Sequence, residues 1–121
     1  MDFTVESKSF HFSVRIVKLC RNLRNGQKEF ILSNQLLRSG TSIGANIAEA
    51  QQAQSRADFV SKISIALKEA VETDYWLRLL NASDYLSEAD FNSYIHECRE
   101  IQKMLTAIAR TTKSTIHKEE C

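Results

Sequence analysis

The sequence has no proline among its 121 residues and contains only three glycines. Proline is the residue that interrupts an α-helix most strongly, so its absence leaves every segment free to continue as a helix. Glycine is the usual residue of tight turns, and its scarcity leaves little material for a loop-rich fold. We therefore expect long helices joined by short connections.

Other absences exclude whole classes of protein. The first ten residues, "MDFTVESKSF", lack the charged and then apolar pattern of a signal peptide. No apolar run approaches the roughly 20 residues of a transmembrane helix. The cysteines are Cys20, Cys98 and Cys121. Their odd number and the lack of a CxxC pair favour core thiols in a reducing compartment over a disulfide framework. We expect a cytoplasmic protein with no membrane partner.

Four amphipathic segments make up most of the chain. Apolar residues recur in them at helical spacing, and the expected helices span about residues 5–25, 29–53, 56–82 and 88–112. Ser55 and Ser87 are each followed by an aspartate three residues later, a pattern typical of helix N-termini. Gly26 is the expected C-terminal cap of the first helix. We predict an all-α fold with one domain over residues 1–121, an antiparallel up-down-up-down four-helix bundle.

The segment "RSGTSIGANIAEA", residues 38–50, concentrates small and polar residues inside the second expected helix. Gly40, Gly44 and Ala48 follow one another every four residues and form a smooth ridge on one side of it. Each glycine costs about 1 kcal/mol of helix propensity relative to alanine. This cost indicates that another helix packs closely against the ridge, either inside the bundle or between subunits.

A line of polar residues lies about a quarter turn from that ridge. The line consists of Gln35, Arg38, Ser42, Asn46 and Glu49. Two interpretations are open, a solvated helix face or a buried network in which Asn46 and Glu49 bind a basic or hydroxyl partner. A buried carboxylate without a partner costs several kcal/mol, so the network would require a cation such as Arg38.

Two long motifs carry a resemblance to a known family. They are "QLLRSGTSIGANIAEA", residues 35–50, and "DFVSKISIALKEAVETDYWLRLL", residues 58–80. They resemble the bacterial four-helix-bundle protein family, also called the ribosomal-RNA intervening-sequence protein family. The resemblance covers nearly the whole chain and implies a bundle that assembles as a homopentamer. A distant relative, the accessory variability protein of diversity-generating retroelements, is a basic pentameric bundle that binds nucleic acid and a reverse transcriptase.

The adjacent aromatic residues Tyr75 and Trp76 are candidates for a subunit interface. Aromatic side chains near a surface often mark an interface, although both residues could also lie at the edge of the core. The pentamer that the resemblance implies favours a subunit contact for Trp76.

Basic residues concentrate at the two ends of the sequence. Residues 7–28 and 101–118 contain six and four Lys or Arg residues and no acidic residue, although the net charge is only +1. The first and last helices of an up-down-up-down bundle are neighbours, so their cations could share one side, unless they are ordinary solvated charges. The candidate nucleic-acid-binding residues are Arg15, Lys18, Arg21, Arg24, Lys103, Arg110 and Lys113. A pentamer would repeat this surface five times.

The leading hypothesis is a non-enzymatic oligomeric protein that binds structured RNA or DNA through phosphate contacts. The alternative is a scaffold for protein–protein interaction. An enzyme has little support, because the Glu-x-x-His pairs of a metal-binding bundle are missing and no phosphate-binding loop follows a strand. The three histidines, at His11, His96 and His117, are preceded three residues earlier by Lys8, Ser93 and Ser114. We therefore predict no catalytic residue, cofactor or metal.

Overall fold

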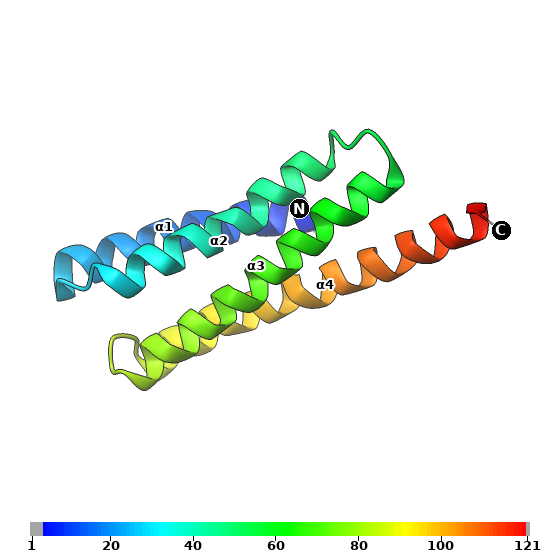
Figure 1. The fold of residues 1–121 in the computed structure, drawn as a ribbon. Coiled ribbons are helices and arrows are strands. Elements are labelled where there is room, and N and C mark those ends of the chain that lie inside the picture. Colours follow the sequence, from blue (N-terminus) through cyan, green and yellow to red (C-terminus); the bar gives the residue numbers. More distant parts are fainter. Residues whose placement is uncertain (1–3, 121) are drawn as a thin grey trace.

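The computed structural model describes residues 4–120, with side chains described for residues 4–115. It contains four helices, α1 (Val5–Gln27), α2 (Ile31–Ala50), α3 (Arg56–Ala82) and α4 (Glu88–Glu120). Successive helices run in opposite directions, and α2 packs against both α1 and α3 (Figure 1). No strand occurs in residues 4–120. The predicted all-α four-helix bundle is confirmed.

Side-chain caps set the starts of three helices. The Thr4 hydroxyl accepts a hydrogen bond from the Ser7 amide at 3.1 Å at the start of α1. Ser55 and Ser87 accept hydrogen bonds in the same way, from amides three residues later at 3.0 and 3.2 Å. These serines satisfy backbone donors that have no partner inside the first turn of a helix. The caps predicted for α3 and α4 are therefore present.

The connection between α1 and α2 differs from the expectation. Gly26 continues α1 as a helical residue, and the left-handed position falls on Lys28, with φ 56°. The prediction that Gly26 caps α1 is therefore wrong. The carboxylate of Glu29 accepts three hydrogen bonds from the amides of residues 31 to 33, at 3.1, 2.8 and 2.7 Å. Because Glu29 caps the helix from outside, α2 begins at Ile31, later than expected.

Two helix ends also differ from the predicted ranges. Helix α2 ends at Ala50, three residues before its expected end. Helix α4 continues to Glu120, eight residues beyond its expected end. Neither difference changes the order or direction of the helices.

The core consists of apolar side chains that all four helices contribute. Burying one such side chain stabilises the fold by about 1.5–3 kcal/mol. The largest fully buried apolar residues are Phe12, Ile16, Leu23, Leu36, Ile43, Ile47, Ile63, Leu77, Leu80, Ile101 and Leu105.

Helix α4 lies beside α1 over only part of its length. The Lys8 ammonium pairs with the Glu100 carboxylate at one end of α1, and the Gln27 amide donates to the Tyr85 carbonyl at the other, at 2.8 Å. Residues 8–27 of α1 therefore face residues 85–100, which comprise the end of the α3–α4 connection and the first part of α4. Beyond that contact α4 continues for 20 residues, or about 30 Å at 1.5 Å per residue. This part of α4 extends past the start of α1 (Figure 1).

Candidate nucleic-acid interface

The structure separates the candidate cations into two groups. The pairing of Lys8 with Glu100 and of Gln27 with Tyr85 places Lys18 opposite about residue 92 of α4. Arg110 lies 18 residues farther along α4, a distance of about 27 Å along the helix. The expected single surface, made jointly by the first and last helices, is therefore not formed within one chain.

Two of the α1 cations are already engaged with neighbouring side chains. A guanidinium nitrogen of Arg15 lies 2.9 Å from a Glu97 carboxylate oxygen, and another donates to the Ser93 hydroxyl at 2.8 Å. The same guanidinium lies 4.2 Å above the Tyr94 ring, and Arg24 lies 5.9 Å from the Phe30 ring centroid. Arg15 therefore joins α1 to α4, which leaves it poorly placed to meet a ligand.

Lys18 and Arg21 complete the α1 group, and both are exposed. They lie in the part of α1 that faces the first half of α4. Their charges can meet a ligand only on a surface separate from the cations near the end of α4.

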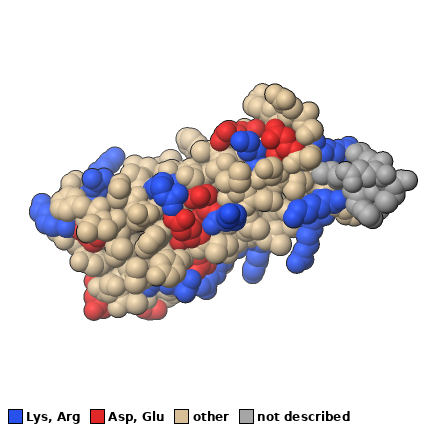
Figure 2. Space-filling view, viewed as in Figure 1, with Lys and Arg blue, Asp and Glu red and all other residues tan. Residues whose placement is uncertain are grey.

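The cations of α4 form a continuous stripe. Their spacings of four, seven and three residues keep them on one side of the helix. We call this set the α4 basic stripe; it consists of Arg99, Lys103, Arg110 and Lys113. Figure 2 shows Lys and Arg side chains projecting from the lower right edge of the molecule, where Figure 1 places α4.

A shallow groove of about 480 Å³ runs along this stripe. Its charged lining residues are Arg99, Lys103 and Arg110. The small residues Thr106 and Ala107 separate the last two cations, and they leave space for a group to approach between them. No acidic residue occurs in residues 101–115. No acidic residue therefore lines the groove, while Arg99 at one end of it is paired with Asp74 of α3.

Arg99 is the stripe residue that sequence reasoning missed. Its guanidinium Nε lies 3.0 Å from the carboxylate of Asp74 on α3, and Gln102 donates to the same oxygen at 3.0 Å. Arg78 binds the other carboxylate oxygen at 2.9 Å. The four-residue spacing of Asp74 and Arg78 is visible in the sequence, whereas the contacts from α4 depend on packing.

Asp74 is a buried anion that three donors stabilise. Burial by itself raises the pKa of its carboxyl group. Hydrogen bonds from Arg99, Gln102 and Arg78 lower that pKa by more, and it lies below its ordinary value. The carboxylate is therefore ionised at neutral pH, and it fixes the position of Arg99 at the start of the stripe.

Arg38, from the predicted polar line, binds across to α3. Its guanidinium donates to Glu69 at 3.2 Å and forms an ion pair with Glu72. The Glu72 carboxylate also accepts a hydrogen bond from the Trp76 indole at 3.0 Å. Bonds from Trp76 and Arg38 outweigh the effect of burial and lower the pKa of Glu72. The partners of Arg38 are therefore glutamates of α3.

Two further members of the polar line, Ser42 and Asn46, bind the backbone of the preceding turn. The Ser42 hydroxyl donates to the Arg38 carbonyl at 2.6 Å, and the Asn46 amide donates to the Ser42 carbonyl at 2.8 Å. Glu49 is exposed and lies 3.5 Å from the Lys62 ammonium. The structure therefore shows a solvated face, in which Asn46 is half-buried, and no buried network links Asn46 to Glu49.

The glycine ridge faces α1 inside the bundle. A Cβ atom added to Gly40 would lie 2.8 Å from Cγ2 of Ile16, closer than atoms in contact allow. A Cβ atom on Gly44 would lie 3.3 Å from the Ser13 hydroxyl oxygen and 3.5 Å from the Ser9 carbonyl oxygen. The ridge therefore brings α1 and α2 together within one chain.

The two aromatic candidates have different surroundings. Trp76 is half-buried against the core, and its indole N–H is bound to Glu72. The Tyr75 side chain is exposed and contacts the Trp76 ring edge-to-face, with centroids 5.1 Å apart. Tyr75 is therefore the more accessible of the two.

The described residues offer little for metal or thiol chemistry. In residues 4–115 no group of three or more His, Cys, Asp or Glu side chains is arranged to hold a metal ion. Burial raises the pKa of both the Cys20 and Cys98 thiols to about 12, so these thiols are protonated at neutral pH. His117 and Cys121 lie outside the residues with described side chains. No described helix is long and apolar enough to cross a bilayer.

Four antiparallel helices around one apolar core define a four-helix-bundle protein. The family described as 23S rRNA-intervening sequence protein matches residues 1–107, and the chain belongs to this family. A crystal structure of a Bacteroides thetaiotaomicron protein of the S23 ribosomal protein family is 56% identical in sequence, with a TM-score of 0.87. The match covers 88% of this chain and 98% of that one, which is described as having unknown function. None of the curated proteins matches this chain.

Proposed function

We propose that this chain is a non-enzymatic, oligomeric, cytoplasmic protein that binds structured RNA or DNA through phosphate contacts at the α4 basic stripe. The carrying observation is that Lys103, Arg110 and Lys113 are exposed on one side of α4 and take part in no salt bridge within residues 4–115. Arg15, Arg38 and Arg78, in contrast, are each paired with a carboxylate. The stripe therefore places three cations without a salt bridge in the described residues on one side of a segment, residues 101–115, that contains no acidic residue.

The length of the stripe suits a nucleic-acid backbone. Arg99 and Lys113 are 14 residues apart, which corresponds to about 21 Å along the helix. One strand of a duplex presents a phosphate about every 3.4 Å along its axis, so the stripe can lie beside about six phosphates. Lys and Arg bind phosphate oxygens without reading base identity. We therefore expect binding that depends on salt and only weakly on sequence.

Assembly would strengthen this weak contact. Each chain offers three stripe cations that form no salt bridge within residues 4–115, too few for tight binding at physiological salt. The family resemblance implies a homopentamer, in which five stripes could contact one folded RNA or several duplex segments. Linked contacts raise the effective concentration of each further contact, so the assembly would bind much more tightly than one chain.

The test is binding of the purified protein to a labelled structured RNA and a duplex DNA, from about 50 to about 300 mM salt, with light scattering to give the mass. The variant Lys103→Ala/Arg110→Ala removes two stripe cations. The control, Lys18→Ala/Arg21→Ala, removes two exposed α1 cations and matches the change in net charge. We expect the stripe variant to reduce the slope of log K against log salt by about 0.9 for each cation removed from one binding chain.

Two results would contradict the proposal. The first is no detectable binding by the wild type at the lowest salt. The second is an equal loss of affinity in the stripe variant and the α1 variant, because general electrostatic attraction would then explain the binding.

A protein-interaction scaffold is the second candidate function. The observation that favours it is apolar surface exposed on α1, where the Phe10 side chain is 72% exposed. This function predicts capture of a protein partner that persists at high salt.

A further inference from the structure

Helix α4 exposes only part of its circumference along the α4 basic stripe. Ile101, Leu105 and Ala109 on its inner side are buried in the core. Lys103 and Arg110 lie on the other side and are exposed. An α-helix with its side chains is about 10–12 Å across, so about half of that diameter, roughly 5–6 Å, stands free of the bundle. This height limits how deeply α4 can enter a groove of a ligand.

The stripe cations form two pairs with a gap between them. Arg99 and Lys103 are four residues apart, and Arg110 and Lys113 are three residues apart. The midpoints of the two pairs are separated by about 10.5 residues, or about 16 Å along the helix. All four positions lie within about 80° of one another around the helix axis. The two pairs can therefore contact the same ligand at two places.

Short side chains occupy the gap between the two pairs. Ala107 is the exposed residue between Lys103 and Arg110, and Thr106 beside it is half-buried. Both of them line the shallow groove on α4 together with Gln102. The surface of a ligand can therefore come close to the α4 backbone at this point, while longer side chains contact it on either side.

Two oxygen atoms in the gap are available as hydrogen-bond acceptors. The Gln102 side-chain nitrogen donates to the Asp74 carboxylate at 3.0 Å, and the Gln102 Oε1 atom accepts no hydrogen bond within residues 4–115. The Thr106 hydroxyl donates its proton to the Gln102 backbone carbonyl at 2.8 Å, so its oxygen can accept from a ligand. The stripe therefore suits a ligand that donates hydrogen bonds between two rows of negative charge.

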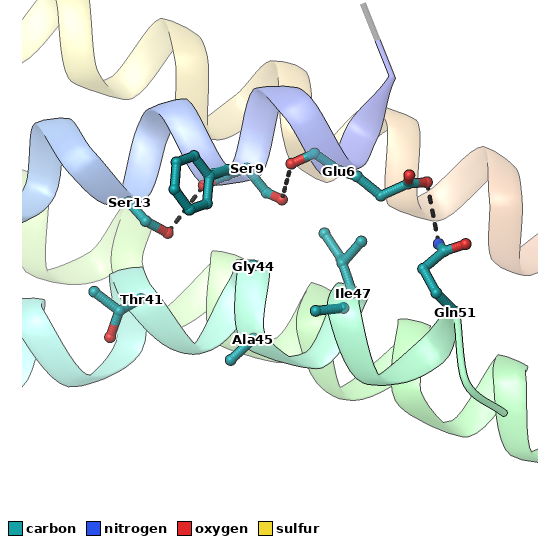
Figure 3. A pocket seen from close by; sticks show the side chains of 10 residues that line it. Glu6, Ser9, Ser13, Thr41, Gly44, Ala45, Ile47 and Gln51 are labelled. Carbon is teal, nitrogen blue, oxygen red and sulfur yellow. Dashed lines mark hydrogen bonds between the residues drawn. The ribbon is translucent and has the colours of Figure 1, made fainter.

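Two other hollows of the described surface do not suit a phosphate backbone. The hollow between α1 and α2 has a volume of about 550 Å³, and its one charged lining residue is Glu6 (Figure 3). The hollow at the start of α4 is lined by the acidic residues Asp84, Glu88 and Asp90. Carboxylates in both places would repel phosphate groups, whereas no acidic residue lines the groove on α4.

The free height of α4 distinguishes between the grooves of nucleic-acid duplexes. The major groove of B-form DNA is about 8.5 Å deep, which exceeds the roughly 5–6 Å of α4 that stands free. The minor groove of B-form DNA is about 6 Å wide and too narrow for a helix. Duplex RNA, in contrast, has a wide and shallow minor groove that displays the 2′-hydroxyl groups of both strands. A 2′-hydroxyl can donate the hydrogen bond that the two acceptors require.

We propose that the α4 basic stripe binds double-stranded RNA by lying across its minor groove. One cation pair contacts the phosphates of each strand, and Thr106 and Gln102 accept hydrogen bonds from 2′-hydroxyl groups between them. This inference rests on the proposed function and identifies the class of nucleic acid that the same site binds. Because DNA has no 2′-hydroxyl, a DNA duplex of the same sequence should bind more weakly.

Asp74 positions two of the groups that this contact uses. Its carboxylate lies 3.0 Å from Nε and 3.5 Å from a terminal nitrogen of Arg99, which leaves the other terminal nitrogen for a phosphate. The same carboxylate binds the side-chain nitrogen of Gln102 and so directs its carbonyl oxygen away from Asp74. One buried anion of α3 therefore orients both a phosphate-binding cation and an acceptor for a 2′-hydroxyl.

The test compares four labelled ligands of one sequence by fluorescence anisotropy at about 100 mM salt. They are a duplex RNA of about 20 base pairs, the same duplex with 2′-fluoro groups, the corresponding duplex DNA and the single-stranded RNA. The 2′-fluoro duplex keeps the A-form but cannot donate a hydrogen bond from the 2′ position. It therefore separates recognition of the 2′-hydroxyl from recognition of groove shape.

The matched protein variants change one hydroxyl group at a time. Thr106→Val removes the acceptor and preserves the shape of the side chain, while Thr106→Ser retains the hydroxyl. Thr111→Val is the control, because Thr111 is exposed on α4 outside the stripe. Circular dichroism shows whether each variant keeps the helicity of the wild type. If Thr106→Val loses helicity, the comparison of the two RNA duplexes on the wild type tests the same contact.

We expect the wild type to bind duplex RNA about tenfold more tightly than duplex DNA, and the 2′-fluoro duplex about 2- to 10-fold more weakly than duplex RNA. Thr106→Val should weaken binding of duplex RNA by about 2- to 10-fold and leave binding of the 2′-fluoro duplex and of DNA unchanged. Thr106→Ser and Thr111→Val should bind all four ligands as the wild type does.

Several results would overturn the inference, and they differ from a failure of the proposed function. Equal, salt-dependent affinity for duplex RNA and duplex DNA would remove the RNA preference and leave phosphate binding in place. Equal affinity for duplex RNA and the 2′-fluoro duplex would exclude the 2′-hydroxyl contact, as would equal losses in Thr106→Val and Thr111→Val. Tighter binding of the single strand would exclude the duplex groove. Binding of none of the four ligands would contradict both the inference and the proposed function.

Discussion

Replacing Gly40 with alanine tests how closely α1 and α2 pack. The new Cβ atom would lie 2.8 Å from Cγ2 and 3.1 Å from Cγ1 of Ile16. Ile16 is completely buried, and a β-branched side chain has few alternative rotamers in a helix, so it has little room to yield. The helices or the side chain must shift, and overpacking of this kind costs about 1–3 kcal/mol.

Helix propensity acts in the opposite direction. Alanine is favoured over glycine by about 1 kcal/mol inside a helix, so the net loss of stability for Gly40→Ala should be about 0–2 kcal/mol. Gly26 is the control, because it is also helical and an added Cβ atom would meet nothing within 4 Å. Gly26→Ala should stabilise the protein by about 0.5–1 kcal/mol. The two variants should therefore differ by about 1–3 kcal/mol.

The assay is reversible thermal or urea unfolding followed by circular dichroism, at a fixed protein concentration. For a chain of this length, 1 kcal/mol corresponds to a change in Tm of about 3–5 °C. The substitution Ile16→Ala removes both clashing carbon atoms, so in that background Gly40→Ala should become stabilising. Equal stabilisation by Gly40→Ala and Gly26→Ala in the wild type would refute the close-packing argument, as would an unchanged effect in the Ile16→Ala background.

Three further predictions concern single side chains. Asp74→Asn should cost about 2 kcal/mol of unfolding free energy, because it removes the buried anion that three donors bind. Folding lowers the pKa of Asp74, so the stability that its carboxylate contributes is present above about pH 4 and is lost as the pH falls through the folded-state pKa. Urea unfolding from pH 6 to pH 3 should therefore show a steeper loss of unfolding free energy in the wild type than in Asp74→Asn. Lys28→Gly should stabilise the protein by about 0.5–1 kcal/mol and raise Tm, because glycine adopts the left-handed backbone at φ 56° without steric strain. An unchanged Tm would contradict the argument that Lys28 is strained there. Glu29→Ala should cost about 1–2 kcal/mol in the same unfolding assay because three α2 amides lose their acceptor, while Glu29→Gln should cost less.

Much of the local structure could be predicted from the sequence. The period of the apolar residues predicted four helices, and the serine caps at Ser55 and Ser87 were found in the structure. The glycine ridge was expected to meet another helix, and Ile16 of α1 contacts it. These features depend on residues close together in the chain, so a one-dimensional pattern contains them.

The start of α2 shows why a local pattern can still mislead. Glycine is the usual residue at the left-handed end of a helix, so Gly26 was the natural choice in the sequence. The hydrogen bonds of Glu29 to the first amides of α2 instead place the turn at Lys28. Gly26 and Lys28 are two residues apart at the end of α1, so the preference for glycine does not by itself identify the left-handed position.

The sequence by itself determined the helices, their order and the side of each helix that enters the core, because apolar periodicity encodes burial. The tertiary structure alone decided which distant charges meet. The offset between α1 and α4 separates Lys18 from Arg110, and the packing of α3 on α4 brings Arg99 to Asp74. No local pattern records such a contact, because the relative shift of two helices depends on how all their side chains interdigitate. That shift confines the proposed nucleic-acid interface to α4.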